Sequence, residues 1–187
     1  MSFDLYYHQR RLETLQDLFS QFSGVILDLG CGTSLVTEFK PNVIGIDIGS
    51  QKNVDWPIKA DACNIPIRHG SIDCIYAGEI IEHLENQEAF LHEIRRVLKD
   101  NGLLLISTPN ISDAYGNHKK MLEYKQFKQQ VTTSGFAILK RKGIYCRYFS
   151  RTGLYRKVKF RYVKRFLMII PFPVSISYNV VLLCRKI

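Results

Sequence analysis

Two apolar segments near the start of the chain constrain its fold more than any other feature. The first, Val25–Leu29, leads into the turn Gly30–Gly32, and the second, Val43–Ile46, ends at Asp47. Runs rich in β-branched residues are typical of buried parallel strands. Glycines at the end of such a strand let a ligand approach the backbone, because no Cβ stands in the way. The pair therefore predicts an open α/β sheet that binds a ligand at the carboxyl ends of neighbouring strands.

The turn departs from the pattern of dinucleotide-binding proteins. Those proteins place Gly-x-Gly-x-x-Gly before a helix whose N-terminus holds a pyrophosphate. This chain has Ser34 soon after the two glycines and carries Asp28 just ahead of them. A carboxylate there would repel a pyrophosphate and suits a cationic ligand. Asp47, which closes the second strand, is expected to meet ribose hydroxyls.

Two further segments follow in an order that resembles the class I S-adenosylmethionine-dependent methyltransferases. Ala60–Ile67 is similar to the family's Gly-Asp-Ala-x-x-Leu-Pro-Phe segment, and Ser71–Glu79 is similar to its Ser-Phe-Asp-x-Val strand. The resemblance covers roughly Val25 to Gly135 and points to the type 11, ubiquinone-biosynthesis-like group that acts on small molecules. It implies one Rossmann-like domain over residues 1–187. The expected sheet has seven strands, mostly parallel with an antiparallel last strand, and helices on both faces.

The resemblance also implies the cofactor, S-adenosylmethionine, and its contacts. In the family, Asp28 and the glycine turn face the methionine part, Asp47 takes the ribose hydroxyls and Asp61 lies near the adenine amino group. The end of the fourth strand lies under the sulfonium. The expected cofactor-binding residues are Asp28, Gly30, Cys31, Gly32, Asp47, Ile48, Asp61, Ala62, Ala77 and Gly78.

The connections around the second strand are short. Only about ten residues separate Gly32 from that strand, so only a short helix fits there. Between Asp47 and Asp61, scattered Gly, Asn and Pro residues leave little room for a helix. We expect a loop that carries Trp56 to wall the adenine pocket.

Helical periodicity and apolar runs predict the remaining elements. The first helix lies within the N-terminal segment 1–23, and the second is expected to stop at Asn101-Gly102. The expected elements are helices over residues 5–22, 86–99 and 122–134 and strands over residues 103–107, 135–139 and 178–186.

Charge is distributed unevenly along the chain. All seventeen acidic residues lie at or before Glu123, and the chain from Tyr124 onward carries fifteen Lys and Arg. Residues 143–175, where bases alternate with aromatics, resemble the lid insertion of the family. The basic stretch over residues 140–165 indicates contact with RNA or an anionic membrane surface. A solvated face or an amphipathic lid packed on the sheet explains the same pattern equally well.

Cysteine usage and hydropathy bear on location. The five cysteines form no Cys-x-x-Cys pair, which favours reduced thiols and a cytoplasmic protein. The first residues lack the pattern of a secretion signal. The nineteen uncharged residues Phe166–Cys184 are interrupted by Pro, Ser and Asn, so no transmembrane segment is expected.

The candidate catalytic residues, Glu79 and His83, follow the fourth strand. Methyl transfer from a sulfonium is an in-line displacement that depends on holding donor and acceptor together, and a base or a metal helps to remove the acceptor's proton. With Glu82, these residues are expected to share one face of a helical turn. Glu-x-x-Glu-His is similar to the divalent-cation motif of small-RNA 2′-O-methyltransferases and of some ubiquinone-pathway O-methyltransferases, with Ser107–Asn110 and His118 at similar positions. The motif also occurs in the family without a metal, with Glu82 as surface charge and His83 as a pocket wall, and no metal ligand is assigned.

The sequence thus predicts a methyltransferase that uses S-adenosylmethionine on a small or lipid-linked acceptor, with oxygen as the favoured atom. Two alternatives stay open. One is a 2′-O RNA methyltransferase that uses the basic segment, and the other is a non-catalytic, cofactor-binding partner subunit.

Overall fold

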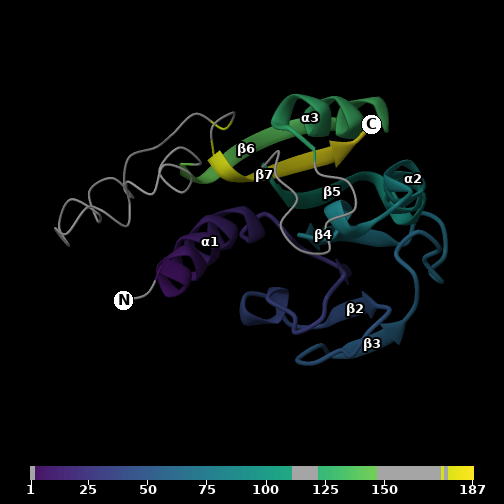
Figure 1. Cartoon of the computed structure of the whole chain (residues 1–187). Helices are drawn as coiled ribbons and strands as arrows, with labels where there is room; N and C mark the ends of the chain where they lie inside the picture. Colours follow the sequence, from purple (N-terminus) through teal and green to yellow (C-terminus); the bar gives the residue numbers. More distant parts are fainter. Residues whose placement is uncertain (1–2, 111–121, 147–173, 175–176) are drawn as a thin grey trace, which may run out of the picture.

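The chain folds around one seven-stranded sheet with the order β3-β2-β1-β4-β5-β7-β6 (Figure 1). The computed structural model describes residues 3–110, 122–146, 174 and 177–187. Neighbouring strands pair in parallel except β7, which runs antiparallel to both β5 and β6. The predicted sheet, with its reversed last strand, is therefore confirmed. The strands are β1 (Ile26–Leu29), β2 (Val43–Asp47), β3 (Trp56–Lys59), β4 (Ile72–Gly78), β5 (Leu98–Pro109), β6 (Phe136–Cys146) and β7 (Ser177–Lys186).

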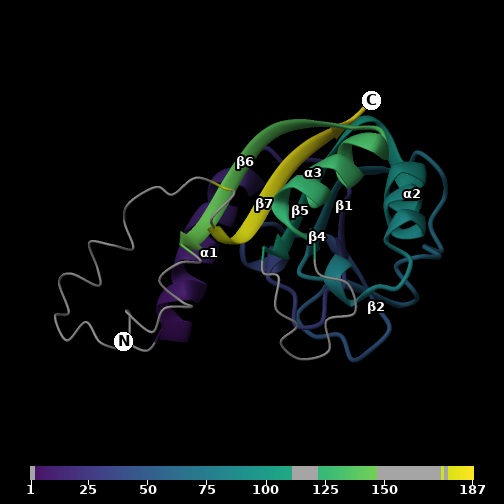
Figure 2. The ribbon, with the colours of Figure 1, turned by 45° about the horizontal axis from the view of Figure 1, so that its top comes forward.

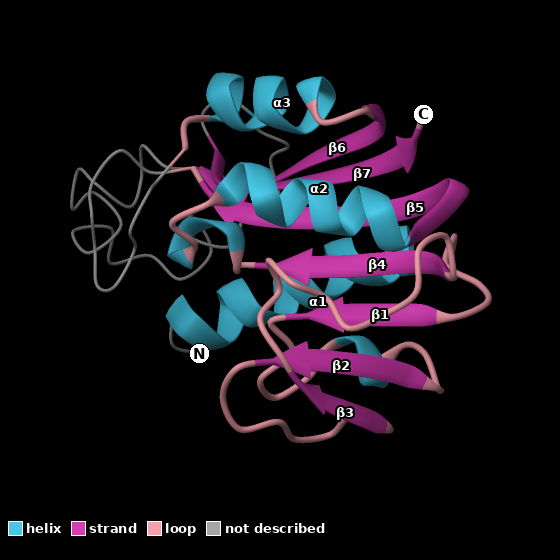
Figure 3. Cartoon of the chain, turned by 90° about the vertical axis from the view of Figure 1, so that its right-hand side faces the viewer, coloured by secondary structure: helices cyan, strands magenta, loops and turns pink. Residues whose placement is uncertain are grey.

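Helices cover both faces of the sheet, as expected. Helix α1 (Phe3–Phe19) lies on one face, and α2 (Gln87–Val97) and α3 (Tyr124–Thr133) lie on the other (Figures 2 and 3). Each face has its own cluster of buried side chains. Phe19 of α1 packs edge-on against Tyr76 of β4, with ring centroids 5.2 Å apart, whereas Phe90 of α2 is fully buried on the opposite face. Burying a side chain of this size contributes about 1.5–3 kcal/mol, so both layers stabilise the sheet.

Helix α2 begins and ends close to the predicted positions. The Asn86 side chain caps its first turn by accepting a hydrogen bond from the Ala89 N–H at 2.9 Å. The helix ends two residues earlier than the sequence predicts, because β5 already begins at Leu98. Asn101, at φ +61°, and Gly102 therefore lie within an extended segment and do not cap the helix. Apolar periodicity does not distinguish a last helical turn from the first residues of a following strand.

The connections around β2 are short, as predicted, but the prediction for Trp56 is wrong. A single 3-10 turn, η1 (Val36–Glu38), joins β1 to β2. Trp56 does not lie in a loop at the adenine side, since it begins the edge strand β3 and pairs with Ile44 near the amino end of β2. Its side chain is 62% exposed. The edge of β2 needs hydrogen-bond partners, and the four residues from Trp56 to Lys59 supply them.

Strand β6 is longer than predicted. A register shift between Ile138 and Lys140 leaves Leu139 as an extra residue, and the strand continues to Cys146. The first residues of the expected insertion 143–175 are therefore strand. Residues 147–173, including most of the basic stretch 140–165, lie outside the described residues.

Candidate functional site

The carboxyl ends of β1, β2 and β4 meet at one edge of the sheet (Figure 3). Because parallel strands end together, this edge collects side chains that are distant in sequence. Four acidic residues lie in or next to these strand ends: Asp28, Asp47, Glu79 and Glu82. Their concentration contrasts with the net charge of +9 for the whole chain and makes this edge attractive to a cation.

The glycine turn folds back on β2. The N–H groups of Gly30 and Cys31 donate to the Ile46 carbonyl at 2.8 and 3.2 Å. Gly30 (φ +68°) and Gly32 (φ +44°) both have left-handed backbones. A Cβ on Gly30 would lie 2.7 Å from the Ile80 Cδ1 atom, whereas the nearest atom to a Cβ on Gly32 is the Asp47 Oδ2 at 4.0 Å. The turn therefore leaves space for a ligand at Gly32 and is filled by protein at Gly30.

Asp47 is anchored to this turn by both carboxylate oxygens. Its Oδ2 accepts from the Gly32 N–H at 2.9 Å, and its Oδ1 accepts from the Gly49 N–H at 2.7 Å. An ionised carboxylate offers about four lone-pair positions, so each oxygen can accept a second hydrogen bond. The carboxylate is thus held in place and still able to bind a pair of hydroxyls.

Asp28 is the most deeply placed acid of the site. It is 2% exposed, and the Ser34 hydroxyl donates to its Oδ2 at 2.7 Å. The pKa of Asp28 is raised to about 7, chiefly by burial and also by the Asp47 charge, against the lowering effects of the Ser34 hydrogen bond and the Arg11 charge. A cation bound beside Asp28 would favour its ionised form.

Glu79 links the end of β4 to two other strands. It is held at φ +57°, and its N–H donates to the Ser107 carbonyl at 3.1 Å. Its Oε1 accepts from the Ser107 hydroxyl and its Oε2 from the Asn179 amide, both at 2.7 Å. A left-handed backbone in a residue other than Gly is uncommon, and such conformations cluster at functional sites.

Glu82 is buried, and its predicted placement is wrong in two respects. It belongs to the 3-10 turn η2 (Ile81–His83), which Glu79 precedes, so the predicted shared face of a helical turn does not form. Glu82 is also not a surface charge, because it is only 1% exposed. The Thr108 hydroxyl donates to its Oε2 at 3.2 Å. Burial, followed by the Glu79 charge, raises the pKa of Glu82 to about 8.

The other expected site residues differ in how far they are buried. Ala77 is fully buried in the core, Ala62 is buried, and Ile48 is 71% exposed. A Cβ on Gly78 would overlap the Tyr76 hydroxyl. Asp61 and His83 are exposed, and the Asp61 Oδ1 accepts from the Cys63 N–H at 2.8 Å.

The thiol in the glycine turn is poorly suited to act as a nucleophile. Cys31 is buried, and its pKa is raised to about 12, chiefly by burial and also by the Asp28 and Asp47 charges. Thiolate is the reactive form, so at neutral pH this side chain serves packing.

Three contacts of the site escaped sequence reasoning. Ser34 and Asn179 each hold one of the acids, and Arg11 of α1 donates to the Tyr76 hydroxyl at 3.1 Å. Asn179 lies one hundred positions from Glu79, so no local pattern could have linked them. Ser34 could have been found from the sequence, because it is a small hydroxyl residue at the position where glycine-rich turns often have a third glycine.

Among the residues that the structure describes, no group of three His, Cys, Asp or Glu side chains could hold a metal ion. His118, which the sequence comparison placed beside the Glu-x-x-Glu-His motif, lies outside the described residues.

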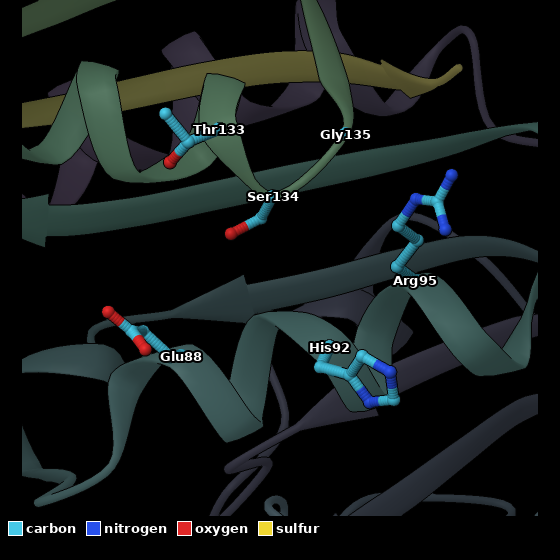
Figure 4. A pocket seen from close by; sticks show the side chains of 6 residues that line it. All are labelled: Glu88, His92, Arg95, Thr133, Ser134 and Gly135. Carbon is cyan, nitrogen blue, oxygen red and sulfur yellow. The ribbon is translucent and has the colours of Figure 1, made fainter.

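A groove of about 350 Å³ lies elsewhere, between α2 and the turn from α3 to β6 (Figure 4). It contains none of the expected site residues. Its lining mixes one acid, two basic or imidazole side chains and two hydroxyls: Glu88, His92, Arg95, Thr133, Ser134 and Gly135.

Comparison with known proteins relates this chain to methyltransferases. A family model described as a methyltransferase domain matches residues 27–106. The chain has 28% identity over 163 residues to a probable S-adenosylmethionine-dependent methyltransferase of Mycolicibacterium smegmatis, covering 75% of this chain and 63% of the relative. It has 31% identity to a ubiquinone biosynthesis O-methyltransferase of Rhodopseudomonas palustris, covering 54% of this chain and 46% of the relative. The alignments thus span less than two thirds of these relatives.

A solved structure agrees with the fold. The structure of a methyltransferase from Thermotoga maritima, described as a possible histamine N-methyltransferase, superposes with a TM-score of 0.71 at 15% identity, covering 97% of this chain and 89% of that one. Over residues 27–106, which the family model covers, the chain is similar to methyltransferase domains, and the relative named above as a probable S-adenosylmethionine-dependent methyltransferase extends this similarity to 75% of the chain. The Mycolicibacterium smegmatis relative is named as dependent on S-adenosylmethionine.

Proposed function

We propose that this protein transfers a methyl group from S-adenosylmethionine to the oxygen of a small or lipid-linked acceptor. The observation that carries the proposal is the pair formed by Gly32 and Asp47. Gly32 leaves open space at the carboxyl edge of the sheet, and Asp47 holds a fixed carboxylate beside it with lone pairs to spare.

The residues at this edge fit the cofactor chemically. S-adenosylmethionine carries a sulfonium, an ammonium and two ribose hydroxyls, and when bound it supplies an electrophilic methyl group. Asp47 would accept hydrogen bonds from the ribose hydroxyls, because its backbone partners already fix its orientation. Asp28 and the turn would face the methionine part, and exposed Asp61 would lie at the adenine side. In this proposal Gly30 determines the shape of the turn, and the space beside Gly32 holds the ligand.

On the acceptor side, Glu79 and Glu82 supply the groups that can take a proton. Glu79 is oriented by Ser107 and Asn179, and Glu82 by Thr108. A carboxyl whose pKa lies near neutrality is well matched to general acid or base work. We therefore add Glu82 to the candidates Glu79 and His83.

The choice of acceptor rests on the relatives' names and on charge. The relative named a ubiquinone biosynthesis O-methyltransferase supports oxygen and a small or lipid-linked acceptor. The RNA alternative is supported by Lys140, Arg141 and Lys142, which are exposed on the edge strand β6. Among the described helices, none is long and apolar enough to cross a membrane. The free thiols of the described cysteines Cys31, Cys63, Cys74 and Cys184 support a cytoplasmic location.

Cofactor affinity is expected to depend on pH through Asp28. Its pKa of about 7 lies above the usual value for Asp, so the ligand-free protein holds a proton there at pH 6. Binding of a cationic group requires the ionised form, so affinity should fall as the pH drops through about 7, by up to about tenfold per pH unit. Titrations with S-adenosylhomocysteine, which keeps the ammonium, from pH 5.5 to 8 measure this directly.

The charged groups that shift the pKa of Asp28 are Asp47 and Arg11. Arg11 also acts on the buried Glu82, whose pKa is itself raised. Asp28→Asn should bind weakly with a flat pH profile, whereas Glu82→Gln should keep the step near pH 7. A wild-type profile that is flat across this range would remove Asp28 from the site.

Transfer itself is tested by incubating the protein with S-adenosylmethionine labelled in the methyl group and with metabolite, lipid and RNA extracts. We expect label in a small or lipid-linked product, and loss of about a hundredfold or more in rate for Glu79→Ala, as for removal of a general base. S-adenosylhomocysteine affinity should change little in this variant. Label found only in RNA would favour the alternative acceptor, and binding without any transfer would favour a partner subunit.

A further inference from the structure

The loop that joins β3 to β4 is fastened to α2 by two charged side chains. The Arg96 guanidinium donates to the Ile67 carbonyl at 2.9 Å and to the Ile65 carbonyl at 2.7 Å. The Glu93 Oε2 accepts from the Ile65 N–H at 2.8 Å. Three main-chain groups of the loop are thus held by neighbouring side chains of one helix.

The two side chains also hold each other. The Arg96 Nε donates to the Glu93 Oε1 at 2.6 Å, and its Nη2 donates to the Glu93 Oε2 at 2.8 Å. This two-point pairing matches the planar fork of a guanidinium to a carboxylate and fixes both rotamers. The hydrogen bond from Arg96 lowers the pKa of Glu93, which keeps the carboxylate ionised. We call this pair, with its three loop contacts, the α2 clamp.

Other contacts fix the same loop. The Ile65 side chain is buried in the core on the α2 face, and the N–H groups of Gly70 and Ser71 donate to the Arg96 and Val97 carbonyls. The end of the loop nearest β3 is different, because Asp61 is exposed and its Oδ1 accepts from the Cys63 N–H. The clamp therefore sets the backbone on which an exposed carboxylate is presented.

We infer that Glu93 and Arg96 are positioning residues for the cofactor's adenine, which act by fixing the Asp61–Ile67 loop. This inference rests on the proposed function, in which Asp61 lies at the adenine side. A hydrogen bond that the Asp61 carboxylate accepts from the ligand is effective only if the carboxylate is held in position before binding, because ordering it on binding would cost affinity.

The chain offers a matched control. Arg95 is the neighbour of Arg96 on the same helix, but it donates to the Ile187 carbonyl and projects into the groove between α2 and the α3–β6 turn (Figure 4). Arg95→Met removes the same charge and keeps a similar side-chain length without touching the loop. Glu93→Gln serves as a second clamp variant, since it keeps an oxygen for the Ile65 N–H and loses the ion pair.

The experiment combines titration with S-adenosylhomocysteine and hydrogen exchange of the ligand-free protein. Arg96→Met and Glu93→Gln should each weaken binding by about tenfold, the size of one lost charge-assisted hydrogen bond. The Ile65 amide should exchange faster in both clamp variants, while Arg95→Met should match the wild type in both measurements.

A double-mutant cycle separates positioning from general stability. If the clamp acts through Asp61, the double variant Asp61→Ala, Arg96→Met should have the same affinity for S-adenosylhomocysteine as whichever single variant binds it more weakly. Additive losses, or an Arg96→Met protein that binds as the wild type does, would overturn the inference. A wild-type protein that binds no S-adenosylhomocysteine would overturn the proposed function itself, so the two failures are distinguishable.

Discussion

Gly30→Val is expected to lower the free energy of unfolding by about 2–5 kcal/mol. About 1–2 kcal/mol comes from placing a side chain on a left-handed backbone, and about 1–3 kcal/mol comes from forcing the new Cβ against the Ile80 side chain. The new atom would start only 2.7 Å from the Ile80 Cδ1. Urea unfolding of the wild type and the variant measures the difference.

Gly70→Val is the matched control for this prediction. Gly70 has a similar backbone angle, φ +61°, but a Cβ there would meet no atom within 4 Å. It should therefore show the backbone cost of about 1–2 kcal/mol alone. Equal losses in the two variants would mean that Ile80 moves aside freely and that the glycine turn is not filled by protein at Gly30.

Asp47→Ala is expected to weaken S-adenosylhomocysteine binding by about 1.5–3 kcal/mol, or roughly ten- to a hundredfold, the range for hydrogen bonds to a charged group. The loss has two sources. The ribose hydroxyls lose their acceptor, and the N–H groups of Gly32 and Gly49 lose the carboxylate that fixes the turn. Titration calorimetry on the folded variant measures the change.

Asp55→Ala is the control for the structural part of this loss, in which a backbone N–H of β2 or its turn loses a carboxylate partner. The Asp55 Oδ2 accepts from the Val43 N–H at 2.9 Å, so it anchors β2 at the strand's other end. This variant should lose stability and keep its affinity for S-adenosylhomocysteine. Equal losses of affinity in the two variants would show that Asp47 contributes only to the shape of β2.

The fold could be predicted from sequence wherever a short-range pattern determined it. The strand that enters the glycine turn and the strand that ends at Asp47 were readable, because buried parallel strands are continuous apolar runs. Apolar periodicity predicted the helices themselves, whereas their place on both faces was implied by the resemblance to the methyltransferases. Trp56 was misplaced because a four-residue edge strand has too little pattern to separate it from a loop.

The site could be predicted in part for the same reason. Asp28 and Asp47 are marked by their place at strand ends, which is a local signal. The burial of Glu82 and the contact between Glu79 and Asn179 depend on how β4, β5 and β7 lie side by side. Such contacts arise from topology, and no spacing within one segment encodes them. The α2 clamp combines a local pair at positions 93 and 96 with a loop about thirty residues earlier in the chain.

Titration of the wild-type protein with S-adenosylhomocysteine tests the central claim most directly, because it needs no knowledge of the acceptor. We expect saturable binding at one site per chain at pH 8. Asp47→Ala should weaken this binding by roughly ten- to a hundredfold, and Asp55→Ala should leave it unchanged. Absence of binding by folded wild-type protein, or binding that Asp47→Ala does not weaken, would contradict this claim.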